Sequence, residues 1–215
     1  MSTRKVAIDG PSGAGKSTIA RRVASDVGFR YVDTGAIYRA VGLYTLTRPL
    51  ELHKMDIEIG YDGAGRQITR LNGEDVTDAI RRHEVSKAAS DVSALPQVRE
   101  FLLQRQRDAA RRHDVIMDGR DIGTVVLPDA DLKIFLTASP RERARRRWEE
   151  MTARGETMDY RSVLRDMENR DESDARRASA PLRPAPDAVI VDTTGNEWER
   201  SVAIIREIVT ERLGL

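Results

Sequence analysis

The residue types best suited to chemistry stand near the start of the chain, where three glycines precede a lysine and a serine. Residues 10–17 read Gly-Pro-Ser-Gly-Ala-Gly-Lys-Ser and match the pattern G-x-x-x-x-G-K-[ST] at every required position. Glycines let the backbone curl so that successive N–H groups point at a phosphate, Lys16 can bridge the β- and γ-phosphates, and the Ser17 hydroxyl can coordinate Mg²⁺. The predicted triphosphate-binding residues are Gly10, Pro11, Ser12, Gly13, Ala14, Gly15, Lys16, Ser17 and Thr18.

The neighbours of this glycine-rich segment support a phosphate site. An apolar run at residues 6–8 predicts a strand before it, and residues 17–27 predict a helix after it, whose positive dipole end would face the same anion. A flexible Gly/Ser turn is the alternative, and the closing Lys-Ser pair in this context disfavours it. The pattern alone does not separate a kinase from a GTPase, a motor or a regulatory ATPase.

Asp33, Thr34 and Arg39 follow the second expected strand, residues 31–32. In an α/β sheet this is the carboxyl edge, where ligands bind. Thr34 can cap the next helix, and Arg39 lies one turn further along it. Plain helix capping and a solvated helix charge are the alternatives.

A second acidic and basic group, Asp118-Gly119-Arg120-Asp121, ends an expected strand at residues 115–117. An arginine held between two acids suits a group that binds an anion or a base edge while its own charge is kept in place. A turn containing an ion pair is the alternative.

A third group is spaced like one helix face. Arg170, Asp174 and Arg177 stand at positions i, i+4 and i+7, which share a face of a helix. An ordinary salt-bridged face is the alternative. The Ala-Pro-Leu run at residues 180–182 ends the expected helix and returns the chain toward the last strand, which brings the stripe back to the sheet edge.

Five arginines fall within residues 141–147, after the expected strand at residues 132–136. Such a run is also typical of a solvated face or of an RNA or membrane patch, but neighbouring glutamates balance much of its charge. We interpret it as a lid that brings arginines to the triphosphate, because phosphoryl transfer depends on positioning and charge neutralisation as water leaves.

Apolar runs separated by helical patterns define the expected fold. The expected strands are residues 6–8, 31–32, 115–117, 132–136 and 188–191, and the clearest helices are residues 17–27, 36–45 and 197–213. This alternation indicates a three-layer α/β fold with a mainly parallel central sheet covered on both faces. Two segments do not follow this alternation of strands and helices. Residues 49–84 read as an insertion of short strands and turns. Residues 139–177 read as polar helix with little apolar stripe, which would pack weakly and move.

Composition excludes several classes of protein. The 215 residues carry 36 basic and 35 acidic side chains, so the net charge of +1 gives no general attraction to nucleic acid or membrane. Cysteine is absent, which suits a reducing compartment, and no run approaches the roughly 18 apolar residues of a membrane span. The start of the chain shows no apolar signal region. We expect a cytoplasmic protein.

Taken in order and spacing, these motifs resemble those of bacterial cytidylate kinases. The resemblance rests on residues 10–17, 33–39, 72–76, 118–126 and 170–182, and it spans about residues 5–210. The run Asp-Gly-Arg-Asp-Ile-Gly-Thr-Val-Val at residues 118–126 is far more specific than the glycine-rich loop. The residues alone indicate only a kinase of a small phosphorylated acceptor, so the identity of the base comes from the resemblance.

The resemblance implies a P-loop core, a monophosphate-binding lobe with a small β-containing insert, and an arginine-rich lid. The implied boundaries are a core at about residues 1–33, 85–138 and 178–215, a lobe at about 34–84 and a lid at about 139–177. It further implies Mg²⁺ as cofactor, ATP and CMP or dCMP as partners, and a monomer.

The resemblance also assigns residues to the acceptor and to catalysis. The implied acceptor set is Thr34, Arg39, Ser90, Arg99, Arg120, Asp121, Arg170, Asp174 and Arg177. Within it, Ser90, Arg99 and Asp121 resemble cytosine readers and Asp174 resembles the pentose contact, while Arg39, Arg120 and Arg177 resemble phosphate contacts. The implied catalytic set is Lys16 with the lid residues Arg143, Arg146 and Arg147.

Two other readings remain open at this point. A small P-loop kinase could act on UMP, AMP, dephospho-coenzyme A or shikimate, and residues 118–126 argue against these. A regulatory or RNA-associated ATPase would use residues 141–147 as a nucleic-acid patch, and the balanced charge argues against that.

Overall fold

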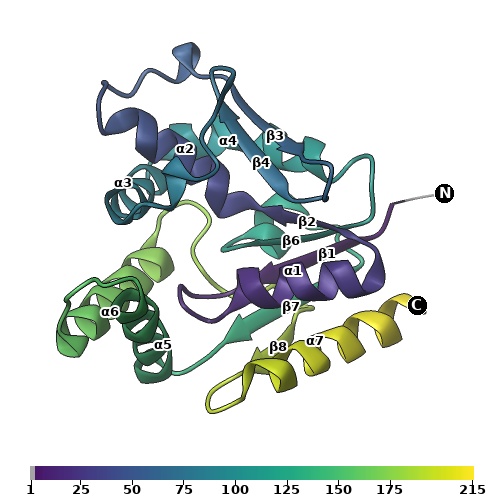
Figure 1. Ribbon diagram of the computed structural model, residues 1–215. Helices are drawn as coiled ribbons and strands as arrows, with labels where there is room; N and C mark the ends of the chain where they lie inside the picture. Colours follow the sequence, from purple (N-terminus) through teal and green to yellow (C-terminus); the bar gives the residue numbers. More distant parts are fainter. Residues whose placement is uncertain (1–2) are drawn as a thin grey trace.

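Five parallel strands form the centre of the molecule, and the computed structural model describes it over residues 3–215 (Figure 1). The strands are β1 (Lys5–Asp9), β2 (Arg30–Asp33), β6 (Val115–Gly119), β7 (Leu132–Thr137) and β8 (Val189–Asp192), in the order β2-β6-β1-β7-β8. The five strands expected from the sequence are confirmed. Because all five run parallel, their carboxyl ends share one edge of the sheet.

Helices cover both faces of this sheet, as the three-layer expectation required (Figure 1). Alternate residues of β1 show why: Ile8 packs in a cluster with α1 (Lys16–Val27) and α7 (Trp198–Leu213), whereas Ala7 packs on the other face against a short π-helix, η3 (Ile122–Val126). Successive strand side chains point to opposite faces, so a continuous apolar strand requires both layers.

A second apolar cluster joins three helices on one side of the sheet. The helices are α2 (Thr34–Thr45), α3 (His83–Ser93) and α4 (Pro96–Ala109). Ile37, Val85 and Leu102 are buried between them. At Gly42 a Cβ atom would lie 2.7 Å from the backbone nitrogen of Ala89, so glycine permits the close approach of α2 and α3.

The insertion expected at residues 49–84 is confirmed as a small antiparallel sheet. Its strands are β3 (Ile57–Tyr61), β4 (Gln67–Leu71) and β5 (Glu74–Asp75), flanked by the 3₁₀ turns η1 (Leu52–Lys54) and η2 (Ala79–Arg81). The Gln67 side chain accepts a hydrogen bond of 2.8 Å from the Asp33 N–H and donates one of 3.1 Å to its carbonyl. These two bonds fasten the insert to the end of β2.

Residues 139–177 form two packed helices, α5 (Pro140–Ala153) and α6 (Tyr160–Arg176), which we call the α5–α6 hairpin (Figure 1). The expectation of little apolar stripe was wrong. Ala144, Met151, Val163 and Met167 are buried in a cluster of their own. These four residues are dispersed among charges in the sequence, so the hairpin has a small core that composition concealed.

Within the described residues, none of the helices combines the length and apolar character needed to cross a membrane.

Candidate active site

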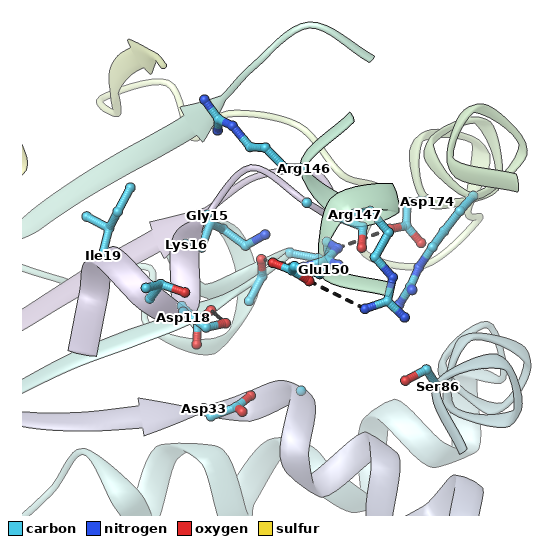
Figure 2. A pocket seen from close by; sticks show the side chains of 18 of the residues that line it. Gly15, Lys16, Ile19, Asp33, Ser86, Asp118, Arg146, Arg147, Glu150 and Asp174 are labelled. Carbon is cyan, nitrogen blue, oxygen red and sulfur yellow. Dashed lines mark hydrogen bonds and ion pairs between the residues drawn. The ribbon is translucent and has the colours of Figure 1, made fainter. Parts of the chain in front are cut away.

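A cleft of about 870 Å³ opens at the carboxyl edge of the central sheet. It is lined by the glycine-rich loop, the starts of α1 and α2, one face of α3, Arg99 of α4, the end of β6, the α5–α6 hairpin and the start of α7 with the segment before it. Figure 2 shows Lys16 and Asp118 on one side of this cleft and Arg147 and Asp174 on the other. The four arginine-containing groups expected from the sequence therefore reach one cavity.

The glycine-rich loop joins β1 to α1, and its backbone conformation requires glycine. Gly13 and Gly15 have φ angles of 75° and 85°, and at Gly10 a Cβ would lie 1.9 Å from the Leu136 carbonyl oxygen. The cleft-lining members of the predicted triphosphate set are Ser12, Gly13, Gly15, Lys16, Ser17 and Thr18. Gly10, Pro11 and Ala14 support the loop without lining the cleft.

Lys16 is the buried cation of the loop, with an exposed fraction of 5%. Its Nζ donates a hydrogen bond of 2.7 Å to the Pro11 carbonyl. Burial lowers the pKa of Lys16 well below its usual value, and the neighbouring Arg120 lowers it further. A positive charge held in such surroundings is favourably placed for a polyanionic ligand, which would compensate it.

Asp118 lies at the end of β6, beside the loop. The Ser17 hydroxyl donates to one of its carboxylate oxygens at 2.7 Å and the Tyr31 hydroxyl donates to the other at 2.9 Å. Burial raises the pKa of Asp118, and the nearby Asp33 raises it further. Sequence reasoning placed Asp118 in the motif but gave it no role; its position after the strand next to β1 was the available signal.

Ser17 and Asp118 also fit the chemistry of Mg²⁺. Hydroxyl and carboxylate oxygens are the hard ligands that this ion prefers, and it takes few protein ligands when phosphates supply the rest. The described part of the chain holds no cluster of three His, Cys, Asp or Glu residues of the kind that binds a metal alone. The donor set suits a metal that arrives with a triphosphate.

Asp9, at the end of β1, connects the two sides of the site. Its carboxylate accepts hydrogen bonds of 2.7 Å from the N–H groups of Ile122 and Gly123, the first turn of η3. Burial raises the pKa of Asp9 to about 6, and this effect outweighs the two N–H bonds that lower it. Asp9 thereby fixes the segment that follows Arg120 and Asp121.

The start of α2 differs from expectation in one respect. Asp33, and not Thr34, caps the helix: its side chain accepts a bond of 3.0 Å from the Ala36 N–H. Thr34 belongs to the helix, and its hydroxyl donates to the Asp118 carbonyl at 2.7 Å. Arg39, one turn on, pairs with Asp33 at 2.8 Å and lines the cleft.

Asp174 binds arginines from two other segments of the chain. It is 1% exposed, accepts a bond of 3.1 Å from Arg120 Nε and pairs closely with Arg177. Arg177 also donates to the Ser93 hydroxyl at 2.9 Å. The helical stripe expected here is slightly wrong, because α6 ends at Arg176 and Arg177 has extended backbone with ψ of 134°.

The arginine cluster holds hydrogen-bond donors that no protein acceptor uses. The Nε atoms of Arg39, Arg170 and Arg177 are buried without a partner among the described residues. Burial lowers the pKa of Arg170 to about 10, and the neighbouring Arg120 adds to this shift. Unpaired donors and crowded cations both favour an added anion at this position.

Arg99 and Asp121 form a nearly buried ion pair beside the cluster. Arg99 also donates to the Ser93 carbonyl at 3.2 Å, and its guanidinium lies 5.7 Å from the centre of the Tyr38 ring. Ser90 does not line the cleft, whereas Ser93, one helical turn later, does. Sequence reasoning missed Ser93 and Tyr38, although each stands within a few residues of a predicted site position.

The arginines of α5 divide into two kinds. Arg146 and Arg147 line the cleft. Arg146 donates to the Thr193 carbonyl at 2.8 Å, and Arg147 pairs with Glu150 at 3.6 Å (Figure 2). Arg143 is 3% exposed and does not line the cleft, because its guanidinium is bound to protein groups. The segment 195–198, which also lines the cleft, was not predicted from the sequence.

This geometry can hold two phosphorylated ligands in one cleft. Backbone N–H groups, the start of α1 and Lys16 form a site for a phosphate chain. Arg39, Arg120, Arg170 and Arg177 line the same cleft and offer a second group of cationic side chains. Lys16, Arg120 and Arg170 line the same cleft, and the charge of Arg120 lowers the pKa values of both Lys16 and Arg170.

Comparisons with known proteins agree in sequence and in fold. The family model "Cytidylate kinase" matches residues 6–211. A cytidylate kinase from Desulfitobacterium hafniense is 48% identical, with 97% of this chain and 94% of that protein covered. One from Geobacillus kaustophilus is 48% identical, with 97% of each covered. A solved shikimate kinase from Bacteroides thetaiotaomicron has a TM-score of 0.54 at 13% identity, with 99% of each chain covered, and it shows a shared fold.

Proposed function

The chain belongs to the cytidylate kinase family, and from that premise we propose that it transfers the γ-phosphoryl group of ATP to CMP or dCMP, which yields ADP and CDP or dCDP. One observation carries the proposal. A phosphate-binding loop with a buried lysine and a cluster of partly unpaired arginines face each other across a single cleft. Enzymes that pass a phosphoryl group between two nucleotides need both anion sites, side by side.

The donor nucleotide is assigned to the glycine-rich loop. Backbone N–H groups of residues 12–17 and the start of α1 would hold its phosphates, and Lys16 would bind the β- and γ-phosphates. Mg²⁺, held with the triphosphate by Ser17 and Asp118, would neutralise phosphate charge. The base is assigned to the cleft between Arg146 and the segment Gly195–Trp198.

The acceptor is assigned to the arginine cluster. Arg39, Arg120, Arg170 and Arg177 would bind its phosphate, as their unpaired donors and mutual repulsion favour. Asp174 would contact the pentose. Arg99 and Asp121 would read the base edge from the α4 side, with Thr34 near the phosphate; Ser90 stays a prediction as a third base contact.

The reaction needs little covalent help from the protein. An acceptor phosphate oxygen attacks the γ-phosphorus while the bond to the bridging oxygen of ADP breaks. Near pH 7 the acceptor phosphate is largely dianionic, because its second pKa is about 6, so no base is required. The role of Lys16 and the arginines is to align the two phosphates and stabilise charge on the transferring group.

We infer that residues of about 34–84 act as a monophosphate-binding lobe and those of about 139–177 as a lid. The α5–α6 hairpin has its own apolar cluster, so it can move as a unit. Closure of such a unit would bring Arg146 and Arg147 to the triphosphate and exclude water.

We further propose that the protein works as a monomer on free nucleotides in the cytoplasm. The arginines of α5 that suggested a nucleic-acid patch are largely neutralised, since Arg145 pairs with Glu142 at 2.8 Å and with Glu149 at 2.7 Å. Phosphates of a nucleic acid would have to break these pairs, which argues against strong binding.

A coupled assay of ADP release across nucleoside monophosphates tests the function. CMP and dCMP should be good acceptors, UMP a distinctly poorer one, and AMP and GMP negligible. Shikimate and dephospho-coenzyme A should give no turnover. Turnover that is fastest with any acceptor other than CMP or dCMP would overturn the proposal.

A further inference from the structure

Arg143 of α5 binds the phosphate loop from the protein side. Its guanidinium makes three hydrogen bonds: Nη1 to the Ser12 carbonyl at 3.0 Å, Nε to the Ala138 carbonyl at 2.8 Å and Nη2 to the Asp171 carboxylate at 2.6 Å. All three directions of its planar fork are therefore used. Three of its five N–H donors are thus used, one on each nitrogen, and the side chain is buried and does not line the cleft.

The contact with Ser12 determines where a neighbouring N–H group points. The Ser12 carbonyl and the Gly13 N–H belong to one planar peptide unit, and no peptide bond in the described chain is cis. In a trans peptide these two groups point in opposite directions. By holding the carbonyl on the protein side, Arg143 turns the Gly13 N–H to the other side, and Gly13 lines the cleft.

Asp171 connects this contact to the acceptor side of the cleft. It stands on α6 next to Arg170 and one turn before Asp174, which both line the cleft. A second contact runs in parallel, because a Cβ on Gly13 would lie 2.6 Å from the Met167 methyl group of α6. The helix that carries acceptor-site residues therefore rests directly on the phosphate loop.

We propose that Arg143 and Asp171 are a positioning pair that makes the orientation of the Ser12–Gly13 peptide depend on the seating of α6. ATP and the acceptor nucleotide then bind cooperatively, since an acceptor that fixes α6 also completes the phosphate loop. This inference rests on the proposed function. Arg143 is accordingly a residue that acts through the loop, and the γ-phosphate is left to Lys16, Arg146 and Arg147.

Calorimetry on the full chain measures this coupling. The affinity for a non-hydrolysable ATP analogue is determined alone and with saturating CMP, and the ratio is the coupling factor. For the natural sequence we expect tighter binding with CMP by about 5- to 150-fold, the usual range of coupling between sites. In Asp171→Asn and in Arg143→Lys the ratio should fall to about one. Asparagine keeps the size of Asp171 but removes its charge, and lysine keeps the charge of Arg143 but lacks the planar fork that reaches Ser12, Ala138 and Asp171 together.

The controls separate positioning from a structural role. Arg165→Ala changes an exposed arginine of the same helix and should keep the natural coupling factor. The double variant Arg143→Lys/Asp171→Asn should lose no more coupling than either single one, as for residues that act as a unit. Melting temperatures are recorded for all variants, and if Arg143→Lys does not fold, Asp171→Asn alone decides.

The outcomes distinguish this inference from the function on which it rests. If the natural protein binds neither ATP analogue nor CMP, the proposed function fails. If both bind but the natural coupling factor is one, or if the variants lower only the melting temperature and keep the coupling factor, the positioning pair is overturned and the function stands.

Discussion

The two halves of the cleft hold anions in different ways. The glycine-rich loop is made of backbone within one stretch of eight residues and is shaped by the φ angles of its glycines. The arginine cluster is made of side chains from α2, from α6 and from the residues that follow β6 and α6. Arg39 is already paired with Asp33, and Arg120 and Arg177 are paired with Asp174. One half is preformed, whereas the other must exchange protein carboxylates for a ligand.

This difference explains how each half would respond to change. Backbone donors cannot be removed by a single substitution, so the loop is sensitive mainly at Lys16 and at its glycines. In the cluster the guanidinium groups of Arg39, Arg120 and Arg177 would be shared between a carboxylate and the ligand, so one substitution there disturbs folding and binding together. Substitutions in the two halves of the cleft should therefore affect different properties: turnover, use of the acceptor, stability or selectivity for the base.

Lys16→Met should have the largest effect. Methionine is close to lysine in length but removes the charge, so turnover should fall by about a thousandfold, as when a charge-stabilising donor of the transition state is lost. The fold should persist, because burial already disfavours the Lys16 charge. Steady-state kinetics and circular dichroism measure both. Near-normal turnover would remove Lys16 from the mechanism.

Arg177→Ala and Arg120→Ala should damage the acceptor half alone. Each removes hydrogen bonds to charged groups worth about 1.5–3 kcal/mol apiece, so kcat/KM for CMP should fall by about 10²- to 10³-fold. ATP affinity should stay close to that of the natural protein. Binding of each nucleotide is measured separately by calorimetry. Weaker ATP binding with unchanged CMP binding would mean that the two sites are assigned the wrong way round.

The same contrast governs what the sequence could predict. The loop, the five strands and the small antiparallel insert follow from local patterns: glycine spacing, continuous apolar runs and turn residues. The helices α3 and α4 and the π-helix η3 were not predicted. In η3 the deciding contact is Asp9, which binds Ile122 across 113 positions.

The arginine cluster shows why the rest of the site could not be predicted from the sequence. The motifs identified Arg120, Asp174 and Arg177 separately, but their pairing spans 54 positions and the bond from Arg177 to Ser93 spans 84. Ser93 carries no sequence signal that distinguishes it from Ser90, and only the packing of α3 decides which of them reaches the cleft. Arg143 belonged to the expected lid arginines, yet the fold binds it to Ser12.

Asp9, which joins the two halves, should make stability depend on pH. Its pKa is raised to about 6 in the folded protein and is about 3.9 in an unfolded chain, so folding favours the protonated form. Its contribution is full below pH 4 and is lost as the pH rises through 6, a change of about 3 kcal/mol in the free energy of unfolding. Asp9→Asn should lack this change, as urea unfolding between pH 4 and 7 would measure.

Asp62, a carboxylate whose pKa is lowered in the folded protein, provides the control. Hydrogen bonds from Arg66 lower the pKa of the half-buried Asp62, so its contribution is present above about pH 4 and is lost as the pH falls below that value. Asp62→Asn should thus change the pH profile in the other direction. If the natural protein and Asp9→Asn show parallel profiles, Asp9 is ionised in the fold and the link between the halves is purely structural.

Substitution of Asp121 should have the smallest effect, and this effect should be on the selectivity for the base. The glycine-rich loop contacts no acceptor base, so its substitutions should leave this selectivity unchanged. Cytosine presents an amino group at its 4-position and uracil presents a carbonyl, so a site that offers Asp121 as acceptor leaves that buried oxygen unpaired with UMP. The mismatch costs about 2 kcal/mol, or about thirtyfold in kcat/KM. Asp121→Ala should therefore lower kcat/KM with CMP much more than with UMP, and narrow the ratio between these two values.

Because Asp121→Ala also leaves Arg99 without its partner, Asp121→Asn is measured beside it: an amide can donate to the uracil carbonyl while keeping the shape of the pocket. A ratio that is unchanged in both variants would show that Asp121 only holds Arg99, and selectivity would then rest on Arg99, Ser90, Ser93 or the backbone.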